Sequence, residues 1–147
     1  MLDQKLIGKT YPEIVFSVEK QRLKFFAKAT QQTDPIYFDE DFAKTKGHRS
    51  ILAPLTFLTT VGYEQENPYQ YLEDLGVPLG SILHAKQEYT NYELIYAGDQ
   101  LRMKSKIGEI YEKKKGMLEF VSFISHYKNQ KNKLVAESIS TLVLRNK

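Results

Sequence analysis

The sequence offers few side chains that could carry out chemistry. It contains no cysteine and three histidines, His48, His84 and His126, which are spread along the chain. The lack of cysteine excludes a thiolate nucleophile and a cysteine-ligated metal, and scattered histidines argue against a zinc site. Besides the histidines, the candidate for acid–base chemistry is Asp34, which precedes Pro35. We therefore expect no bound metal and no cofactor.

Each of these candidates also has a structural interpretation. An aspartate before proline at the end of a helix is typical of a turn, and we favour that role for Asp34 over that of a catalytic carboxylate. His84 lies between Leu83 and Ala85 in a predicted strand, which favours a hydrogen-bonded core histidine over a catalytic base. His126 lies among alternating strand residues, and we expect it to be structural.

The most apolar stretch of the chain, from Ser50 to Tyr63, is the element around which these residues must be positioned. It contains no charged residue, although 27% of the chain is charged, and we therefore expect it to be buried. Apolar residues recur in it at the i, i+3 spacing of a helix, and its proline is acceptable only in a first turn. We predict a central helix from about Pro54 to Tyr63 that other elements wrap around.

The second half of the chain has the pattern of an antiparallel sheet. From Leu101 to Ile107 apolar residues alternate with basic ones, which gives a strand one dry and one wet face. Further strands are predicted at residues 14–16, 82–89, 117–127 and 134–145, with turns at 113–116 and 129–132. Helices are predicted at residues 18–30, capped by Ser17, and at 40–46, capped by Asp39.

A curved antiparallel sheet wrapped round one apolar helix is the hot-dog architecture, an α+β fold. The chain has 147 residues, of which 41% are hydrophobic, so we expect residues 1–147 to form a single domain. Its 21 basic and 18 acidic residues are too evenly balanced for a nucleic-acid-binding protein. No apolar run could span a bilayer and no secretory signal is present. We expect a cytoplasmic protein that binds neither nucleic acid nor membrane.

Several stretches, in this order along the chain, resemble the MaoC-like hydratase/dehydratase family. They are residues 18–30, 34–43, 51–57, 82–89 and 97–101. The similarity is greatest to the N-terminal, FAS1-like dehydratase type, which includes the A subunit of two-subunit (3R)-hydroxyacyl-ACP dehydratases. The resemblance implies a hot-dog fold, a dimer, and an acyl thioester on CoA or acyl carrier protein that lies along the subunit interface.

The resemblance also indicates that the catalytic dyad is missing. Complete members carry an aspartate and a histidine in the loop after the first helix, where they act on a water molecule and on the C2 proton of the substrate. The aligned positions hold Gln32 and Tyr37, and neither side chain can shuttle a proton near neutral pH. Tyr37 either lines the acyl tunnel or fills the vacated histidine space, with Gln32 as a partner for its hydroxyl group.

The binding half of the family's site is expected to remain. Free N–H groups at the start of the central helix would face the thioester carbonyl oxygen. A basic cluster just before that helix would suit a phosphopantetheine or CoA phosphate, or an acidic carrier protein, although a solvated turn explains it equally well. The predicted substrate-binding residues are Asp34, Tyr37, Leu55, Thr56, Phe57 and His84, and the predicted carrier contacts are Lys46, His48 and Arg49, next to Lys44.

Two functional hypotheses follow from the resemblance. The first is an acyl-binding subunit of a 3-hydroxyacyl-thioester dehydratase or enoyl-CoA hydratase, a lyase of fatty acid metabolism. It would form a homodimer, or a heterodimer in which a dyad-containing paralogue is catalytic. The alternative is a stand-alone acyl-thioester-binding or thioesterase-like hot-dog protein that uses Asp34 or His84.

Overall fold

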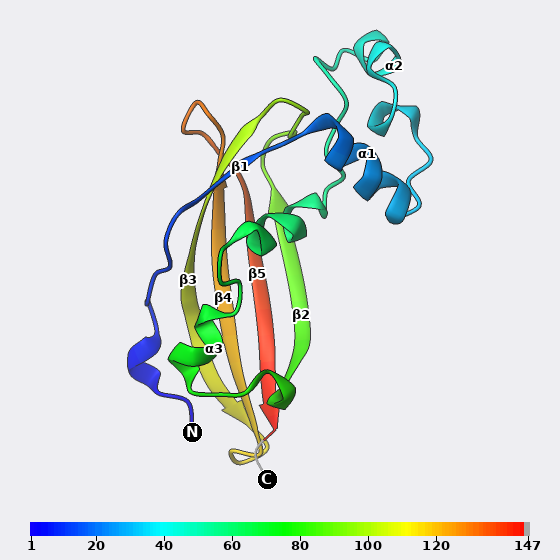
Figure 1. The fold of residues 1–147 in the computed structure, drawn as a ribbon. Coiled ribbons are helices and arrows are strands. Elements are labelled where there is room, and N and C mark those ends of the chain that lie inside the picture. Colours follow the sequence, from blue (N-terminus) through cyan, green and yellow to red (C-terminus); the bar gives the residue numbers. More distant parts are fainter. Residues whose placement is uncertain (146–147) are drawn as a thin grey trace.

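Five antiparallel strands form one long sheet in the computed structural model, which describes residues 1–145 (Figure 1). Their order across the sheet is β1-β3-β4-β5-β2. All the predicted strands are confirmed, and most extend further than the sequence pattern indicates. They are β1 (Ile14–Ser17), β2 (Ile82–Asn91), β3 (Gln100–Lys113), β4 (Leu118–Lys128) and β5 (Leu134–Arg145).

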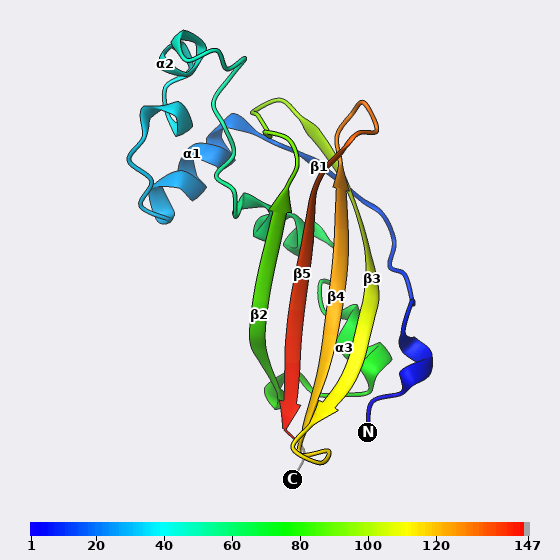
Figure 2. The same ribbon diagram turned by 180° about the vertical axis from the view of Figure 1, so that it is seen from behind.

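The helices lie on one face of the sheet or beyond one of its ends. α1 (Lys20–Ala29) and α2 (Glu40–Thr45) project beyond the end opposite the chain termini, while α3 (Gln70–Leu75) and the 3₁₀ helix Phe57–Glu64, the central helix, lie across one face (Figure 1). Figure 2 shows the opposite face, which no helix of residues 1–145 covers. This arrangement confirms the predicted α+β hot-dog architecture. None of the helices in the described part of the chain is long and apolar enough to cross a bilayer.

The alternation in β3 sets which side chains face the central helix. Leu101, Met103 and Ile107 are buried, while the basic residues between them are exposed, as the period of two in a strand requires. A bulge follows Ile107, where Gly108 lies so close to β4 that an added Cβ would be 2.7 Å from Ser122 Oγ. The Ser122 hydroxyl instead accepts a hydrogen bond from the N–H of Glu109 at 2.7 Å.

The two edges of the sheet differ in how they are covered. Beside β3, the N-terminal segment continues the pairing of β1, because the N–H groups of Gly8 and Tyr11 donate to Ile107 and Ser105 at 2.8 and 2.9 Å. The outer edge of β2 pairs with no strand of residues 1–145. Large apolar side chains are exposed within β2, at Leu83, and in the segments that precede and follow it, at Leu79, Tyr92 and Leu94. An open edge flanked by apolar groups is suited to pairing with another chain.

The central helix begins later than predicted and is a 3₁₀ helix. It starts at Phe57 instead of Pro54, and its first bonds span three residues, from Phe57 N–H to Pro54 O at 2.8 Å and from Thr59 N–H to Thr56 O at 3.1 Å. The expectation that the whole stretch is buried is also wrong, since Leu55 is 58% exposed. In a 3₁₀ helix, residues three positions apart lie directly above one another. Only a narrow row of side chains therefore faces the sheet.

Phe57 anchors the central helix in the core. Its side chain is 1% exposed, and its ring meets Phe16 of β1 and Phe26 of α1 edge-on, with centroids 5.8 and 5.5 Å apart. Such aromatic contacts add to the free energy gained by burying the ring. Leu58 and Val61 are buried beside it, so the helix is attached mainly through its first half.

The helix after β1 begins at Lys20, two residues later than predicted, and Ser17 is not its cap. Glu19 occupies the N-cap position without a side-chain hydrogen bond. The reason is that Val18 continues the strand-like pairing: its N–H donates to Asp99 O, and the Gly98 N–H donates to Val18 O, both at 2.8 Å. A residue whose backbone is paired in this way cannot begin a helix.

The predictions for the other short helices had mixed outcomes. The cap of α2 is confirmed, because Asp39 Oδ1 accepts from the Phe42 N–H at 3.0 Å. α3 is not predicted by the sequence pattern, which indicates an irregular segment there. It is held by the burial of Leu72 and Leu75 and ends at Gly76, whose φ of 66° places it in the left-handed region.

The anchoring role of Phe57 predicts a large loss of stability on truncation. Phe57→Ala should lower the free energy of unfolding by about 3–5 kcal/mol, because it removes a buried ring and leaves a cavity between two other rings. Leu55→Ala is the matched control, and as a change at an exposed position it should cost within about 0.5 kcal/mol. Urea denaturation followed by circular dichroism measures both values. Equal losses for the two variants would contradict the anchoring role.

Candidate functional site

The loop between α1 and α2 has a fixed shape that Asp34 helps to set. Gln31 adopts a positive φ of 58°, and the Gln32 N–H returns to Ala27 O at 2.9 Å, which ends α1. Asp34 Oδ1 then accepts a hydrogen bond from the Ile36 N–H at 3.0 Å and caps the 3₁₀ turn Pro35–Tyr37. Asp34 therefore has the turn-forming role that the sequence favours.

This loop lies next to the segment that leads into the central helix. The Leu52 N–H donates to Ile36 O at 3.2 Å, so residues 31–37 and the approach to the helix share one region of the molecule. Gln32 and Tyr37 are both half-buried there. Within residues 1–145, however, no hydrogen bond joins their side chains, and the predicted pairing of Gln32 with the Tyr37 hydroxyl is absent.

The residues at the start of the central helix differ in accessibility. Leu55 and Thr56 are exposed, and among residues 1–145 their N–H groups donate to no backbone acceptor. Phe57 faces the core and is 1% exposed. A ligand that approaches the helix would therefore meet the backbone of Leu55 and Thr56, and would be separated from the Phe57 ring.

The basic cluster is tied to partners within the chain. Arg49 forms an ion pair with Asp99, and its guanidinium lies 4.5 Å from the centre of the Tyr96 ring. His48 Nδ1 is 3.2 Å from the Tyr96 hydroxyl group. Lys46 lies over the ring of Phe42, 5.3 Å from its centre, and no carboxylate of the described residues pairs with it. Of the predicted carrier contacts, Lys46 is thus the most available to an external anion.

Asp99 is the buried centre of a hydrogen-bond network. Its side chain is 4% exposed and accepts from Arg49, from the Tyr96 N–H at 2.9 Å and from Gln130 Nε2 at 2.8 Å. Burial by itself raises the pKa of this carboxyl group, but the hydrogen bonds from Arg49, Tyr96 and Gln130 outweigh it and hold the pKa below its usual value of 3.8. The network joins three loops that are distant in sequence.

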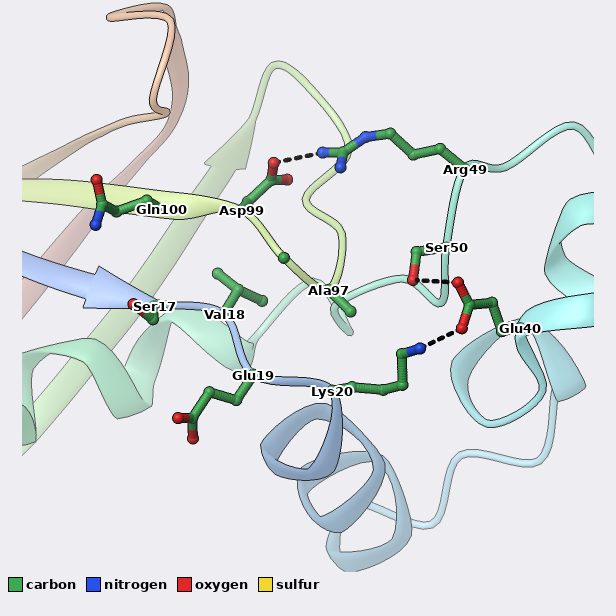
Figure 3. Close-up of a pocket in the computed structure, with 11 residues that line it drawn as sticks. Ser17, Val18, Glu19, Lys20, Glu40, Arg49, Ser50, Ala97, Asp99 and Gln100 are labelled. Carbon is green, nitrogen blue, oxygen red and sulfur yellow. Dashed lines mark hydrogen bonds and ion pairs between the residues drawn. The ribbon is translucent and has the colours of Figure 1, made fainter.

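A cleft of about 690 Å³ lies between this network and the start of α1 (Figure 3). On its other side Glu40 accepts from Lys20 and pairs with Lys44 at 3.4 Å, and the Ser50 hydroxyl donates to it at 3.4 Å. The hydrogen bond from Lys20 is the main cause that lowers the pKa of Glu40. Figure 3 shows the Arg49–Asp99 pair on one side of the cleft and the Lys20–Glu40 pair on the other. Because its charged groups are already paired, we interpret the cleft as structural.

A second cavity, of about 620 Å³, lies between the sheet and the roof formed by the central helix and the segment leading into α3. Apolar side chains such as Leu58, Met103 and Phe123 line part of it. The rest of its lining is polar and includes Thr59, Gln65, His84, Gln87, Ser105, Ser125, Ser138, Ser140 and the tyrosines 11, 63, 69, 71, 89 and 127. Its size is typical of a small-molecule site.

His84 lies in this cavity, and not in the core as predicted. It is exposed, and its Nε2 is 3.3 Å from both Gln87 Oε1 and Ser140 Oγ. The sequence reasoning missed most of the cavity, although serines at inward positions of three strands were a visible signal. His126 lies on the other face, where its Nε2 is 2.8 Å from Glu137 Oε2, which confirms a structural role.

Comparison with known proteins identifies the family. Residues 5–138 match the family model described as the FAS1-like, dehydratase domain region. The chain is 28% identical, over 145 residues, to a UPF0336 protein of Streptomyces griseus, with 98% of this chain and 95% of the relative covered. The chain belongs to the MaoC-like hot-dog dehydratases, in the FAS1-like group.

Solved structures share the fold. The C-terminally truncated HadBC (3R-hydroxyacyl-ACP dehydratase) complex from Mycobacterium tuberculosis is similar with a TM-score of 0.79 and 24% identity, covering 96% of this chain and 99% of that one. A MaoC-like dehydratase from Rhodospirillum rubrum is similar with a TM-score of 0.70 and 21% identity, covering 100% and 98%. These similarities confirm the hot-dog fold of the chain.

The Asp99 network predicts a stability loss that depends on pH. Asp99→Asn should lower the free energy of unfolding at pH 7 by about 1–3 kcal/mol, because Arg49 loses its charged acceptor. A carboxyl group with a lowered pKa stabilises the fold above its unfolded value near 3.8, and that contribution disappears as the pH falls through the lower folded value. The difference from the parent protein should therefore shrink below about pH 3.8.

Urea titrations at pH 7, 5 and 3 measure this difference. Glu66→Gln, the same change at an exposed carboxylate, is the control and should have little effect at any pH. A loss for Asp99→Asn that is the same at all three values would mean that the charge of Asp99 does not stabilise the fold.

Proposed function

We propose that this chain is the acyl-binding subunit of a 3-hydroxyacyl-thioester dehydratase or enoyl-thioester hydratase. The observation that carries the proposal is the cavity of about 620 Å³ under the central helix, in a family member whose dyad positions hold Gln32 and Tyr37. A chain with room for a ligand, and with neither an aspartate nor a histidine at the family's dyad positions, is suited to binding and not to catalysis.

The geometry of the loop supports the loss of chemistry without a loss of fold. The hydrogen bond from Leu52 to Ile36 holds residues 31–37 beside the approach to the central helix. Replacement of an aspartate and a histidine by Gln32 and Tyr37 removes the acid and base, each worth about 10²–10⁴-fold in rate. A partner subunit would then have to supply both groups.

The binding mode that we propose places the thioester at the start of the central helix. The N–H groups of Leu55 and Thr56 would donate to the carbonyl oxygen, and the acyl chain would extend into the cavity past Thr59 and His84. Lys46 would contact the phosphate of CoA or of a carrier protein. Asp34 and Tyr37 would line the approach to the carbonyl group.

A heterodimer with a dyad-containing paralogue is the assembly that we propose. The similar HadBC structure is a complex of a 3R-hydroxyacyl-ACP dehydratase, which supports this choice over a homodimer. A thioesterase-like activity has less support. Asp34 is engaged in capping the turn of residues 35–37. His84 lies in the cavity, beside the proposed acyl chain and not at the start of the central helix, where we place the thioester.

The first test separates binding from catalysis. The purified chain should bind decanoyl-CoA in calorimetry, yet hydrate crotonyl-CoA at no more than a trace of the rate of a dyad-containing relative. Ser140→Phe should weaken binding at least about tenfold, because its side chain faces the cavity and would fill part of it. Ile139→Phe is the matched control, since neighbouring strand residues point to opposite faces of the sheet.

Two results would contradict the proposal. The first is an absence of decanoyl-CoA binding by the folded parent protein. The second is rapid hydration of crotonyl-CoA, or release of free CoA from acyl-CoA, that disappears in His84→Ala or Asp34→Ala. That second result would instead establish the catalytic alternative.

The open edge of β2 predicts where a second chain binds. In the absence of a paralogue we expect a dimer in size-exclusion chromatography with light scattering, and Tyr92→Lys combined with Leu94→Lys should shift it towards the monomer of 17.1 kDa. The two changes place charges among the exposed apolar groups beside that edge. Val15→Lys, at an exposed position of the opposite edge strand β1, should leave the dimer intact. A Tyr92→Lys, Leu94→Lys variant that stays as dimeric as the parent protein would contradict this interface.

A further inference from the structure

We propose that the cavity selects acyl chains that carry oxygen substituents, such as hydroxyl or keto groups, along their length. This inference rests on the proposed acyl-binding function and specifies the substrate class. It comes from the polar lining of the cavity, which differs from the apolar lining expected of a site for an unsubstituted hydrocarbon chain.

A row of hydroxyl groups crosses the sheet side of the cavity. Ser105 of β3 lies opposite Ser125 of β4, which lies opposite Ser138 of β5. The oxygens of Ser105 and Ser125 are 2.7 Å apart. Tyr127, two residues after Ser125 and on the same face of β4, has its hydroxyl 3.1 Å from Ser138 Oγ. All four residues line the cavity.

These hydroxyl groups cannot satisfy one another completely. A hydroxyl group has one hydrogen to donate and two lone pairs to accept with. Hydrogen bonds join Ser105 with Ser125 and Tyr127 with both Ser138 and Ser125. The four hydroxyl groups have four hydrogens, and these three bonds use three of them. At least one donor and several lone pairs in the row therefore remain for a group inside the cavity.

Polar groups continue on both sides of this row. On β2 and β5, His84 Nε2 is 3.3 Å from both Ser140 Oγ and Gln87 Oε1. Burial raises the pKa of Tyr89, and a hydrogen bond with Thr59 of the central helix acts in the opposite direction. Polar groups thus occur on both the sheet and the helix side of the cavity.

Tyr11, in the N-terminal segment, adds a further hydroxyl group to the lining of the cavity. Burial, and then the neighbouring Asp74 carboxylate, raise the pKa of the Tyr11 hydroxyl group far above its usual value. Tyr11 lines the cavity beside Tyr71 and Phe123. The polar lining therefore includes the N-terminal segment as well as the sheet and the central helix.

A saturated chain in this cavity would displace water from these groups without replacing its hydrogen bonds. That desolvation is unfavourable because a buried polar group without a partner loses the bonds it makes in water. An oxygenated chain would restore hydrogen bonds, while Leu58, Met103 and Phe123 would contact its methylene groups. A site with hydrogen-bonding groups for a ligand discriminates strongly against the analogue that lacks the oxygen.

Calorimetry with matched acyl-CoA ligands tests this inference. The probes are decanoyl-CoA and its 5-, 7- and 9-hydroxy analogues, which sample different depths of the cavity. The parent protein should bind at least one hydroxylated probe about three- to tenfold more tightly than decanoyl-CoA, the effect of one or two hydrogen bonds. The double change Ser125→Ala with Ser138→Ala should abolish that preference, and so should Tyr127→Phe, which keeps the ring and its packing.

Ser17→Ala is the control, since it removes a hydroxyl group from an exposed position of β1 outside this cavity and should leave the preference unchanged. Binding of decanoyl-CoA at least as tight as that of every hydroxylated probe overturns this inference and leaves the proposed function intact. A parent protein that binds none of the probes overturns both. Because the preference is measured first on the unmodified chain, the test holds even if one variant fails to fold.

Discussion

The attachment of the central helix through its first half is the constraint on which the rest of the structure depends. Phe57 lies between the rings of Phe16 and Phe26, and Leu58 and Val61 complete a narrow apolar contact. The last two residues of the helix, Tyr63 and Glu64, are exposed. The space that remains between helix and sheet is the cavity of about 620 Å³. A longer and evenly buried helix would fill it.

The same end of the molecule is held by charged contacts as well as by apolar packing. Asp99 gathers hydrogen bonds from Arg49, Tyr96 and Gln130, and Glu40 connects α1, α2 and the segment at Ser50. Asp99 is buried, and a buried carboxylate is stable only when its hydrogen bonds are made. These contacts hold the loops around the start of the central helix beside the loop at residues 31–37, in which positions 32 and 37 hold glutamine and tyrosine.

Binding and catalysis therefore have separate physical bases in this fold. The position of the loop depends on backbone hydrogen bonds, such as that from Leu52 to Ile36, which are indifferent to the side chains at residues 32 and 37. The cavity depends on the helix and on the inward positions of the strands. Substitution of the two dyad residues can thus remove chemistry while the cavity persists, as the proposed division of labour between two subunits requires.

The sequence by itself determined the features that depend on residues close together in the chain. The alternation in β3 predicted its two faces, Asp39 predicted the start of α2, and the uncharged stretch at residues 50–63 predicted the element across the sheet. Only the tertiary structure decided what depends on distant partners. Val18 is excluded from α1 because it pairs with the turn at residues 98–99, and Arg49 is neutralised by a residue fifty positions away. The serines of β3, β4 and β5 form one polar wall because strand register brings them together, and no local pattern contains that register.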